Sequence, residues 1–516
     1  MNRTQNSTRN IFYGIIEKIT NIILPFIVRT IFIQKLGVEY LGIHSLFVSI
    51  LQVLNLAELG FSSAIVYKLY EPIAKNDKSK ICALLNLYKK IYRIVGIVIL
   101  VIGLAILPFL SNLINGEIPP KINIYILYII YLAGTVITYF VFAYKTALLN
   151  AIQRKDIISK VNSILITIKS IAQICILCIY KNIYLYAIIV PIISIINNII
   201  CSVIVDKKYP EYKAEGQVDK ENVAEIRKNV AGILMQRVCT TTRNSLDSTF
   251  LSKFLGLAIV GIYNNYFMVI AALTSIIGVI DDSIRASVGN SIVTESVDKN
   301  YNDMNKYNFI FMWFFGWCTI TLACLFQSFM KMWMGEQYMF SNMIVVLLCI
   351  YFYSLCIGNI RYIYSTAVGL WWEERYITIA QIISNVVLNY ILGKYLGVAG
   401  IVLSTIISIV FIEFVWATKV LYKNYFKNQK ISKYFIWQAI YAGVTIVIAV
   451  ITYFICSRVM GDGILSFIIK ILICIIVPNV LYFICYCKTK YFKEAKEFLI
   501  KIMSKFCTRK GLQINK

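Results

Sequence analysis

Apolar runs of about 20 residues recur along nearly the whole chain, and short polar segments separate them. An α-helix of this length crosses the hydrocarbon core of a bilayer. Helices are predicted rather than open strands, because backbone groups in lipid have no water to bind. The sequence therefore predicts an all-α polytopic membrane protein with fourteen spans, at residues 10–33, 41–67, 84–110, 122–144, 157–180, 183–205, 229–252, 257–280, 307–330, 341–360, 376–393, 398–418, 435–457 and 464–487.

A short motif divides these helices into two halves. The pattern Leu-Gly-x-x-x-x-Gly-Ile occupies residues 36–43, after the first span, and residues 255–262, after the seventh, 219 positions later. Gly provides the bend of a tight turn in each copy. A parallel repeat of this kind places a binding site between two pseudo-symmetric bundles. The predicted domains are a six-helix bundle, a cytoplasmic linker, a second six-helix bundle, an added pair of helices 13 and 14, and a cytoplasmic amphipathic tail, at 1–205, 206–228, 229–421, 430–488 and 489–516.

Basic residues are distributed unevenly between the connections, and this predicts the orientation of the chain. Alternate loops are short and carry one basic residue each, at Lys35, Lys121, Lys181, Lys253, Lys331, Lys394 and Arg458. The other loops and both tails carry most of the remaining Lys and Arg, so we expect both termini in the cytoplasm. The tail over 491–506 has apolar residues at helical spacing with Lys between them, which is typical of a helix on the inner leaflet.

Composition agrees with this class. Of the 516 residues, 59% are hydrophobic, and the mean hydropathy is +0.72, more than a soluble core buries. The basic loops explain the net charge of +25 without a nucleic-acid partner. Most of the 14 cysteines lie in apolar runs, where a thiol behaves as a small hydrophobe. Cys175 and Cys178 are interpreted in the same way, because no second pair or His lies near them in the sequence.

Cations inside the predicted spans are the candidate chemistry. Lys18, Asn21, Pro25 and Arg29 recur every three or four residues, so they share one face of the first helix. The repeat relates Lys18 to Arg237, in a second polar stripe with Thr240, Thr241, Arg243, Asn244 and Asp247. Lys169 lies midway along the fifth span and Glu58 toward the inner end of the second. A charge at the bilayer centre costs about 2.5–3.5 kcal/mol, so its recurrence indicates a purpose.

Two interpretations of these charges remain open. Structural ion pairs, such as Arg243 with Asp247, account for any single residue, and Lys18 lies near enough to the inner surface to snorkel. For the set, cations outnumber anions in the first bundle, which favours a cavity that receives an anion. The chain has no phosphate-binding G-x-x-x-x-G-K-[ST] motif. The single histidine, His44, is expected to be a packed residue rather than a metal ligand or a catalytic group.

The chain resembles the polysaccharide repeat-unit flippases, the O-antigen and capsule transporters of the multidrug/oligosaccharidyl-lipid/polysaccharide exporter superfamily. The resemblance covers nearly the whole chain. It rests on the 6+6+2 helix plan, the repeated motif, and the segments Leu56-Ala-Glu-Leu-Gly-Phe-Ser-Ser-Ala64, Asn244–Gly256, Gly261-Ile-Tyr-Asn-Asn-Tyr266 and Ala286-Ser-Val-Gly-Asn290. It implies a transporter of the bacterial cell membrane, not an enzyme. By alternating access, such a protein moves an undecaprenyl-pyrophosphate-linked oligosaccharide to the outer leaflet for surface polysaccharide synthesis.

The resemblance also implies roles for individual positions. The pyrophosphate contacts are Lys18, Arg29, Arg237 and Arg243, and the hydrogen-bond partners are Asn21, Thr240, Thr241 and Asn244. Lys169 joins this substrate-binding set through the cation excess. Glu58 is a candidate coupling site for Na⁺ or H⁺, with no other cofactor and no metal, and Asp247 is a second such site or the ion-pair partner of Arg243. The expected partners are the lipid-linked oligosaccharide, membrane lipids, a polysaccharide polymerase and glycosyltransferases, and no nucleic acid.

Three rival functions remain open. A lipid II or teichoic acid precursor flippase of the same superfamily is poorly separated from a capsule transporter by sequence. A multidrug exporter of the same fold is expected to have an acid-rich cavity, whereas this one is rich in cations. A membrane polysaccharide polymerase usually carries a large outer loop, whereas every outer loop predicted here is short.

The repeat generates a first prediction. Lys18→Ala and Arg237→Ala are each expected to abolish surface polysaccharide without lowering the amount of protein in the membrane, because each removes a cation that would contact the substrate. Polysaccharide staining and quantitative blotting measure the two quantities. Normal polysaccharide in the double variant would refute the role of these cations.

Overall fold

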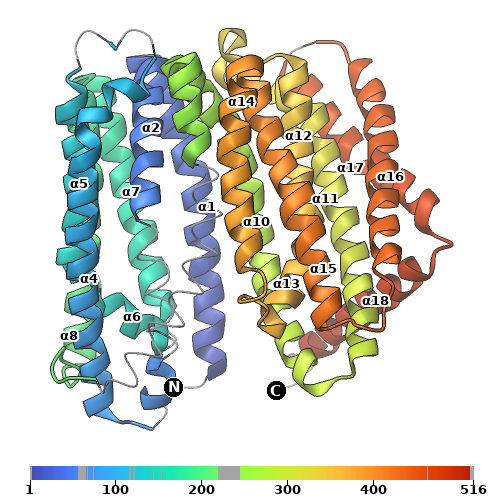
Figure 1. Cartoon of the computed structure of the whole chain (residues 1–516), viewed down its shortest axis with the longest axis horizontal. Helices are drawn as coiled ribbons and strands as arrows, with labels where there is room; N and C mark the ends of the chain where they lie inside the picture. Colours follow the sequence, from blue (N-terminus) through green and yellow to red (C-terminus); the bar gives the residue numbers. More distant parts are fainter. Residues whose placement is uncertain are drawn as a thin grey trace. The chain divides into compact units, whose positions relative to one another are not determined.

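The computed structural model describes residues 3–55, 66, 68–73, 75–115, 118–119, 122–142, 144–152, 154–218, 245–461 and 463–511. All regular elements in these ranges are helices (Figure 1). The α-helices are α1 (Arg3–Leu36), α2 (Val38–Leu54), α4 (Lys78–Ile106), α5 (Ile124–Phe140), α6 (Tyr144–Ala151), α7 (Lys155–Ile179), α8 (Ile183–Lys208), α10 (Leu257–Thr294), α11 (Val297–Met334), α12 (Asn342–Ile357), α13 (Asn359–Val368), α14 (Arg375–Ile407), α15 (Val415–Asn424), α16 (Ile431–Ser457), α17 (Ile464–Tyr486) and α18 (Lys490–Gly511). Shorter 3₁₀ or π segments are η1 (Leu107–Phe109), η2 (Ser111–Leu113), η3 (Glu336–Tyr338) and η4 (Ser408–Phe414).

The chain forms two compact units, residues 1–265 and 266–516. Unit 1 contains α1 to α8, a helical segment over 245–255 and the start of α10. Unit 2 contains the rest of α10 and all later helices. The predicted division at 206–228 follows the sequence repeat rather than the contacts, and it stays a prediction.

Within the described ranges, nine helices are long and apolar enough to cross a membrane, and ten are if the bent pair α5 and α6 counts as one span. This confirms the predicted class of all-α polytopic membrane protein. The bounds of α7 and α17 lie within two residues of the predicted spans 157–180 and 464–487, whereas α10 and α11 extend ten or more residues beyond one end of the spans 257–280 and 307–330. The total of fourteen spans stays a prediction.

One long helical segment, Arg375–Asn424, folds back on itself. Its backbone leaves helical geometry at Gly397, where φ is 59° and ψ is −133°. Hydrogen bonds join the two sides of this break, from Gln381 Nε2 to Glu413 Oε2 (2.7 Å) and from Asn385 Nδ2 to Thr405 Oγ1 (3.1 Å). Pairs that converge on a turn in this order are the signature of two antiparallel arms. The arms correspond to the predicted spans 376–393 and 398–418.

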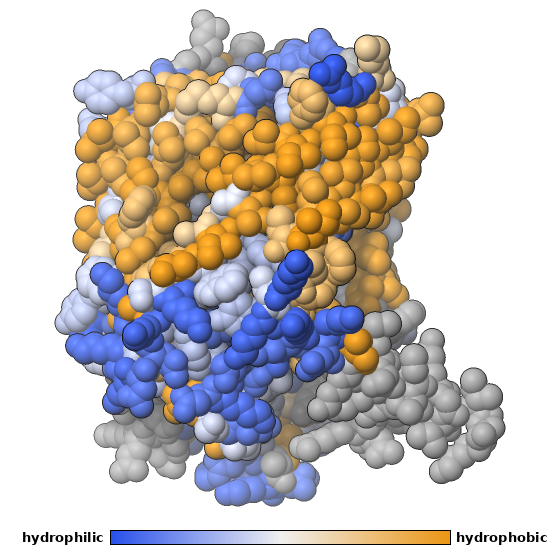
Figure 2. Space-filling view, turned by 90° about the vertical axis from the view of Figure 1, so that its right-hand side faces the viewer, coloured by the Kyte–Doolittle hydropathy of each residue, from blue (hydrophilic) through white to orange (hydrophobic). Residues whose placement is uncertain are grey.

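In unit 2, the surface is divided between lipid-compatible and hydrophilic parts. Figure 2 shows a broad apolar band over one part of this face and hydrophilic side chains gathered below it. The outward apolar side chains of α16 and α17 include Ile446, Val447, Val450, Phe454, Ile464, Leu465, Leu472, Ile475 and Ile476. Because isolated soluble proteins rarely expose apolar patches of this extent, the band agrees with burial in a bilayer.

The predicted amphipathic tail is helical over α18, and its start is held against unit 2 by aromatic rings. Tyr491 meets Trp437 of α16 with ring centroids 5.0 Å apart. Phe492 stacks on Trp313 of α11 at 6.1 Å. The beginning of α18 is therefore docked on the helices that it follows, which fixes where the tail leaves the bundle.

Unit 1 is built around α1 and the helices that pack on it. Asn162 Nδ2 of α7 donates a hydrogen bond to Glu17 Oε1 of α1 (2.8 Å). In the neighbouring pair, Asn198 Nδ2 of α8 donates to the Thr138 carbonyl of α5 (3.2 Å). These polar side chains join helices directly, as is usual where lipid offers them no other partner.

The two copies of the repeated motif pack against each other within unit 1. The first glycine of each copy has a positive φ, 103° at Gly37 and 87° at Gly256, so each makes the predicted bend. The second glycines allow a close backbone approach. A Cβ at Gly42 would overlap the carbonyl oxygen of Leu257, and a Cβ at Gly261 would lie 2.6 Å from that of Val38.

These two contacts are equivalent under the repeat. Gly42 corresponds to Gly261, and Val38 corresponds to Leu257, each pair 219 positions apart. The shift of 219 positions that relates the two motifs therefore relates the contact between Gly42 and Leu257 to the contact between Gly261 and Val38. A reciprocal contact of this kind is what a pseudo-two-fold axis between the motifs produces.

The close approach of the motifs generates a stability prediction. Gly42→Ala is expected to lower the unfolding temperature in detergent, because overpacking costs about 1–3 kcal/mol or more. Gly278→Ala in α10 is the matched control, since no atom lies within 4 Å of its added Cβ. The control should be neutral or slightly stabilising, because Gly in a helix costs roughly 0.5–1 kcal/mol relative to Ala. Equal unfolding temperatures for both variants would contradict the packing of the motifs.

Candidate functional site

The structure describes five of the eleven predicted site residues. Lys18, Asn21 and Arg29 lie on α1, Lys169 lies on α7, and Asp247 lies on the helical segment 245–255. The remaining six lie outside the described residues: Glu58, Arg237, Thr240, Thr241, Arg243 and Asn244. The site is therefore built here from unit 1.

Arg29 of α1 is held by a side chain of another helix in unit 1. Its side chain is half-buried, and its Nε donates a short hydrogen bond to Asn265 Oδ1 of α10. Asn265 is fully buried. The Arg29 Nη2 atom is also buried, and it has no hydrogen-bond partner among the described residues. The guanidinium group is thus held through its Nε atom, while its Nη2 atom can still donate a hydrogen bond.

His44 of α2 lies beside this arginine in a box of aromatic rings. Its Nδ1 lies 2.5 Å from the hydroxyl of Tyr131 of α5. Its ring centroid is 6.1 Å from that of Phe32 of α1 and 5.8 Å from that of Tyr186 of α8. The expectation of a packed histidine agrees with this environment. No group of His, Cys, Asp or Glu that could hold a metal includes His44 in the described part of the chain.

The charges of Arg29 and Lys169 both reach the His44 ring, so the two cations share one region of unit 1. We call Arg29, Phe32, His44, Tyr131, Lys169 and Tyr186 the His44 cluster. Five helices contribute to it, namely α1, α2, α5, α7 and α8. Lys169 is half-buried on α7. Arg29 and Lys169, which are 140 residues apart in the sequence, thus both lie within electrostatic range of His44, and their predicted role in substrate binding stays a prediction.

Within the described residues, no carboxylate offsets these two charges. Neither Arg29 nor Lys169 forms an ion pair with a described Asp or Glu. A cation inside a membrane helix costs about 2.5–3.5 kcal/mol, and an anion beside it lowers that cost. The His44 cluster is therefore an electropositive site. Guanidinium and ammonium groups are well suited to phosphate oxygens.

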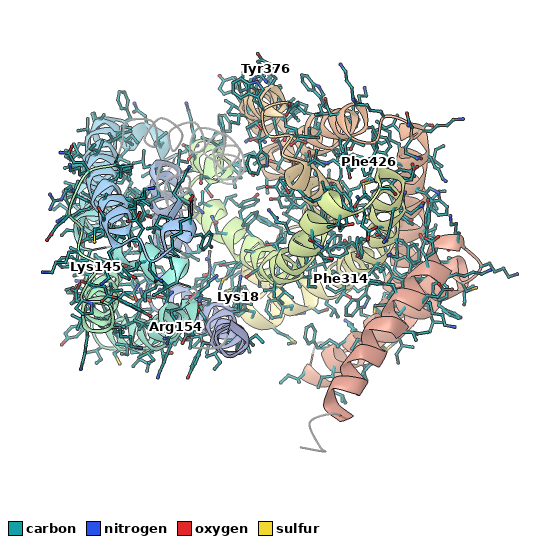
Figure 3. The ribbon with its side chains drawn as sticks, turned by 90° about the horizontal axis from the view of Figure 1, so that it is seen from below. Lys18, Lys145, Arg154, Phe314, Tyr376 and Phe426 are labelled. Atoms are coloured by element: carbon teal, nitrogen blue, oxygen red, sulfur yellow. The ribbon has the colours of Figure 1, made fainter. Side chains whose placement is uncertain are left out.

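Lys18 and Asn21 occupy a different part of α1. Eleven residues separate Lys18 from Arg29, which is about 16 Å along a helix. Both Lys18 and Asn21 are exposed, and Asn21 Nδ2 donates to the Glu17 carbonyl (2.9 Å). Figure 3, which looks along the helices, shows Lys18 on the α1 ribbon and Arg154 on a neighbouring ribbon of unit 1. The residues of the predicted polar stripe therefore lie at two different heights along α1, with Lys18 and Asn21 at one height and Arg29 at the other.

Asp247 is buried beside the motif helix α10. It is 1% exposed, and its Oδ2 accepts a hydrogen bond from the Tyr263 hydroxyl (3.4 Å). Nearby, Asn264 Nδ2 donates to Ser248 Oγ (3.3 Å). These contacts pair the segment 245–255 with α10. The predicted role of Asp247 in holding Arg243 stays a prediction.

Unit 2 contains a buried charge network that the sequence analysis did not select. Arg361 of α13 is 2% exposed, and its guanidinium lies 3.4 Å from Glu374 and 4.0 Å from Glu413. Glu413 lies in the π-helical segment η4, and such segments occur frequently at functional sites. A carboxylate inside the predicted span 398–418 was the available signal for this network.

The chain has the fold of transporters of the MOP superfamily. It is similar to the inward closed conformation of the lipid II flippase MurJ, with a TM-score of 0.66 and 18% identity, over 94% of this chain and 99% of that one. It is also similar to an inward-facing multidrug resistance MATE family transporter of the MOP superfamily (0.63, 14% identity, 79% and 96% covered). A third similar structure, of a MOP superfamily transporter from Pyrococcus furiosus, has a TM-score of 0.57 and 14% identity, over 81% of this chain and 95% of that one.

Comparison with curated protein sequences gave no match. Residues 7–282, slightly more than half of the chain, match the profile of the family described as polysaccharide biosynthesis protein. The chain belongs to this family.

The Arg29 contact generates a prediction about charge. Asn265→Leu removes the acceptor of a charged donor and should lower the unfolding temperature, since such a hydrogen bond contributes about 1.5–3 kcal/mol. Asn265→Asp has the same shape but supplies an anion to an arginine that has no carboxylate partner among the described residues, so it should be at least as stable as the wild type. Thermal unfolding in detergent measures both. If the two variants lose stability equally, Arg29 does not depend on this contact.

Proposed function

We propose that this protein is a flippase for undecaprenyl-pyrophosphate-linked oligosaccharide repeat units, which it moves from the inner to the outer leaflet of the bacterial cell membrane for surface polysaccharide synthesis. The observation that carries the proposal is the pair of cations in the His44 cluster, which no described carboxylate offsets. A substrate head group with negative charge would supply the missing counter-charge. Both termini would lie in the cytoplasm.

The available donors favour a phosphate-bearing head group. Arg29 presents a buried Nη2 without a partner among the described residues, and Lys169 adds an ammonium group. Arginine binds phosphate through its planar fork of donors, whereas lysine acts as a point charge. Two cations, rather than a larger cluster, attract the pyrophosphate while still allowing its release.

The membrane potential favours the proposed direction. The cell interior is negative, so outward movement of an anionic head group gains about 2.3 kcal/mol per charge per 100 mV. The lipid tail remains in the bilayer, and only the head group passes through the hydrated cationic cavity of an alternating-access transporter. Coupling to Na⁺ or H⁺ through Glu58 is part of the same proposal, as is cooperation with a polysaccharide polymerase and glycosyltransferases.

The comparisons support this assignment over a multidrug exporter. The family is described by polysaccharide biosynthesis. The Pyrococcus furiosus transporter is described as having a binding pocket of reverse polarity that suggests a different function. A cationic cluster fits an anionic substrate. The similarity to MurJ, described as a lipid II flippase, keeps a lipid II or teichoic acid precursor as the second candidate.

Transport by purified protein in proteoliposomes tests the proposal. A fluorescent undecaprenyl-pyrophosphate oligosaccharide is placed in one leaflet, and its appearance in the other is followed by quenching. Lys169→Gln and Arg29→Gln should each slow translocation at least tenfold, because each removes a positive charge that would contact the head group. Lys155→Gln is the control, since Lys155 is exposed at the start of the same helix α7.

Two outcomes decide the matter. Wild-type rates in the Lys169→Gln and Arg29→Gln double variant would contradict the proposed site. Labelled lipid II in parallel vesicles separates the two candidates, since a repeat-unit flippase should move the oligosaccharide faster than lipid II. The reverse preference would assign the protein to the second candidate.

A further inference from the structure

Three cysteines from three helices meet inside unit 2. They are Cys324 of α11, Cys456 of α16 and Cys474 of α17, and all three are buried. Their Sγ atoms all lie within 4.8 Å of one another, and those of Cys456 and Cys474 are 3.9 Å apart. Sequence spacing gave no sign of this cluster, because 132 residues separate Cys324 from Cys456.

The helices that carry these thiols are fixed relative to one another by hydrogen bonds. Trp317 Nε1 of α11 donates to the carbonyl of Cys474 itself (2.8 Å). The hydroxyls of Thr445 on α16 and Tyr482 on α17 lie 2.7 Å apart. Gly316 of α11 lies directly against the Tyr482 hydroxyl, where a Cβ would overlap it. The three sulfur atoms are therefore close together because the helices that carry them are fixed relative to one another.

Their separation fits a metal ion bound by three thiolates. Zinc–sulfur bonds are about 2.3 Å long, so sulfur atoms in a trigonal arrangement around such an ion lie about 4.0 Å apart. The Cys456 and Cys474 sulfurs already have this spacing. Small rotations of Cys324 would complete the triangle, since its sulfur lies within 4.8 Å of both others.

The local charge favours a divalent ion. Lys470 lies one turn before Cys474 on α17, its Nζ is 3.3 Å from Ser328 Oγ of α11, and its charge acts on Cys456. Three thiolates, one divalent cation and one ammonium group sum to zero charge. A monovalent ion would leave a net negative charge in a buried site, which is costly.

We propose that Cys324, Cys456 and Cys474 form a binding site for a thiophilic divalent cation, with Zn²⁺ as the physiological ion. Binding replaces three S–H protons by three metal–sulfur bonds and releases three protons to solvent. Because the ligands come from α11, α16 and α17, the ion joins three helices of unit 2. The site is independent of the His44 cluster and of the proposed transport activity.

Titration of the detergent-purified full chain with Cd²⁺, followed by ultraviolet thiolate-to-metal charge transfer, tests the site. All variants carry Cys175→Ser and Cys178→Ser, since these two cysteines are exposed and offer a competing pair. This background should bind one Cd²⁺ per chain. Cys456→Ser should weaken binding at least tenfold and reduce the band. Cys349→Ser, which changes a buried cysteine of α12 outside the cluster, should leave both unchanged.

Stabilisation by Zn²⁺ provides a second measurement that also reports folding. Zn²⁺ should raise the unfolding temperature of the background and of Cys349→Ser, because a ligand that binds only the folded state stabilises it. It should not raise that of Cys456→Ser or Cys474→Ala. Equal stabilisation in a Cys456→Ser protein that is monodisperse without metal would overturn the proposal, as would a Cd²⁺ band that this substitution leaves intact.

Discussion

Within the described residues of unit 1, a cation inside a membrane helix is held by a neutral hydrogen-bond partner on another helix. Arg29 of α1 donates to Asn265 of α10, and this contact requires α10 to lie close to the first hairpin. The repeated motif meets that requirement. Gly261 allows α10 to touch Val38, and Asn265 follows Gly261 by four residues, so both lie on the same face of α10. The glycines of the motif thus position the acceptor of the arginine.

Arg361 of unit 2 and Arg29 of unit 1 differ in the partners that the described residues offer them. In unit 2, Arg361 lies within 4.0 Å of two carboxylates, and Asn385 finds Thr405 across the α14 hairpin. These groups compensate one another, as lipid-buried polar groups must. In unit 1, Arg29 donates to the side-chain amide of Asn265, and within the described residues neither Arg29 nor Lys169 is paired with a carboxylate. A cation without a described counter-charge is costly in a static scaffold, and in the proposed function the anionic head group of the substrate supplies that counter-charge.

The local sequence pattern predicted the helices well but did not predict which side chains of different helices contact one another. The spans, the glycine bends and the cation on α1 follow from periodicity and from the backbone requirements of a turn, and both are properties of neighbouring residues. Asn265 was not selected, because an Asn in a long apolar helix carries no mark of the arginine that it meets. The same holds for Tyr131 and Tyr186, two of 36 tyrosines, because the aromatic box around His44 forms only once four helices are packed together.

The cysteines also show that the local sequence pattern does not predict contacts between helices. Each one, taken alone in an apolar run, behaves as a small hydrophobe, and the exposed Cys175 and Cys178 on α7 agree with that interpretation. Cys324, Cys456 and Cys474 differ from them only in which helix faces they occupy. Lys470, equally ordinary in sequence, becomes the counter-charge of that cluster because α17 lies beside α11. In a helical membrane protein, the role of a polar or reactive residue therefore depends on which side chains of other helices lie beside it. The sequence of its own span shows only that such a residue is present and needs a partner.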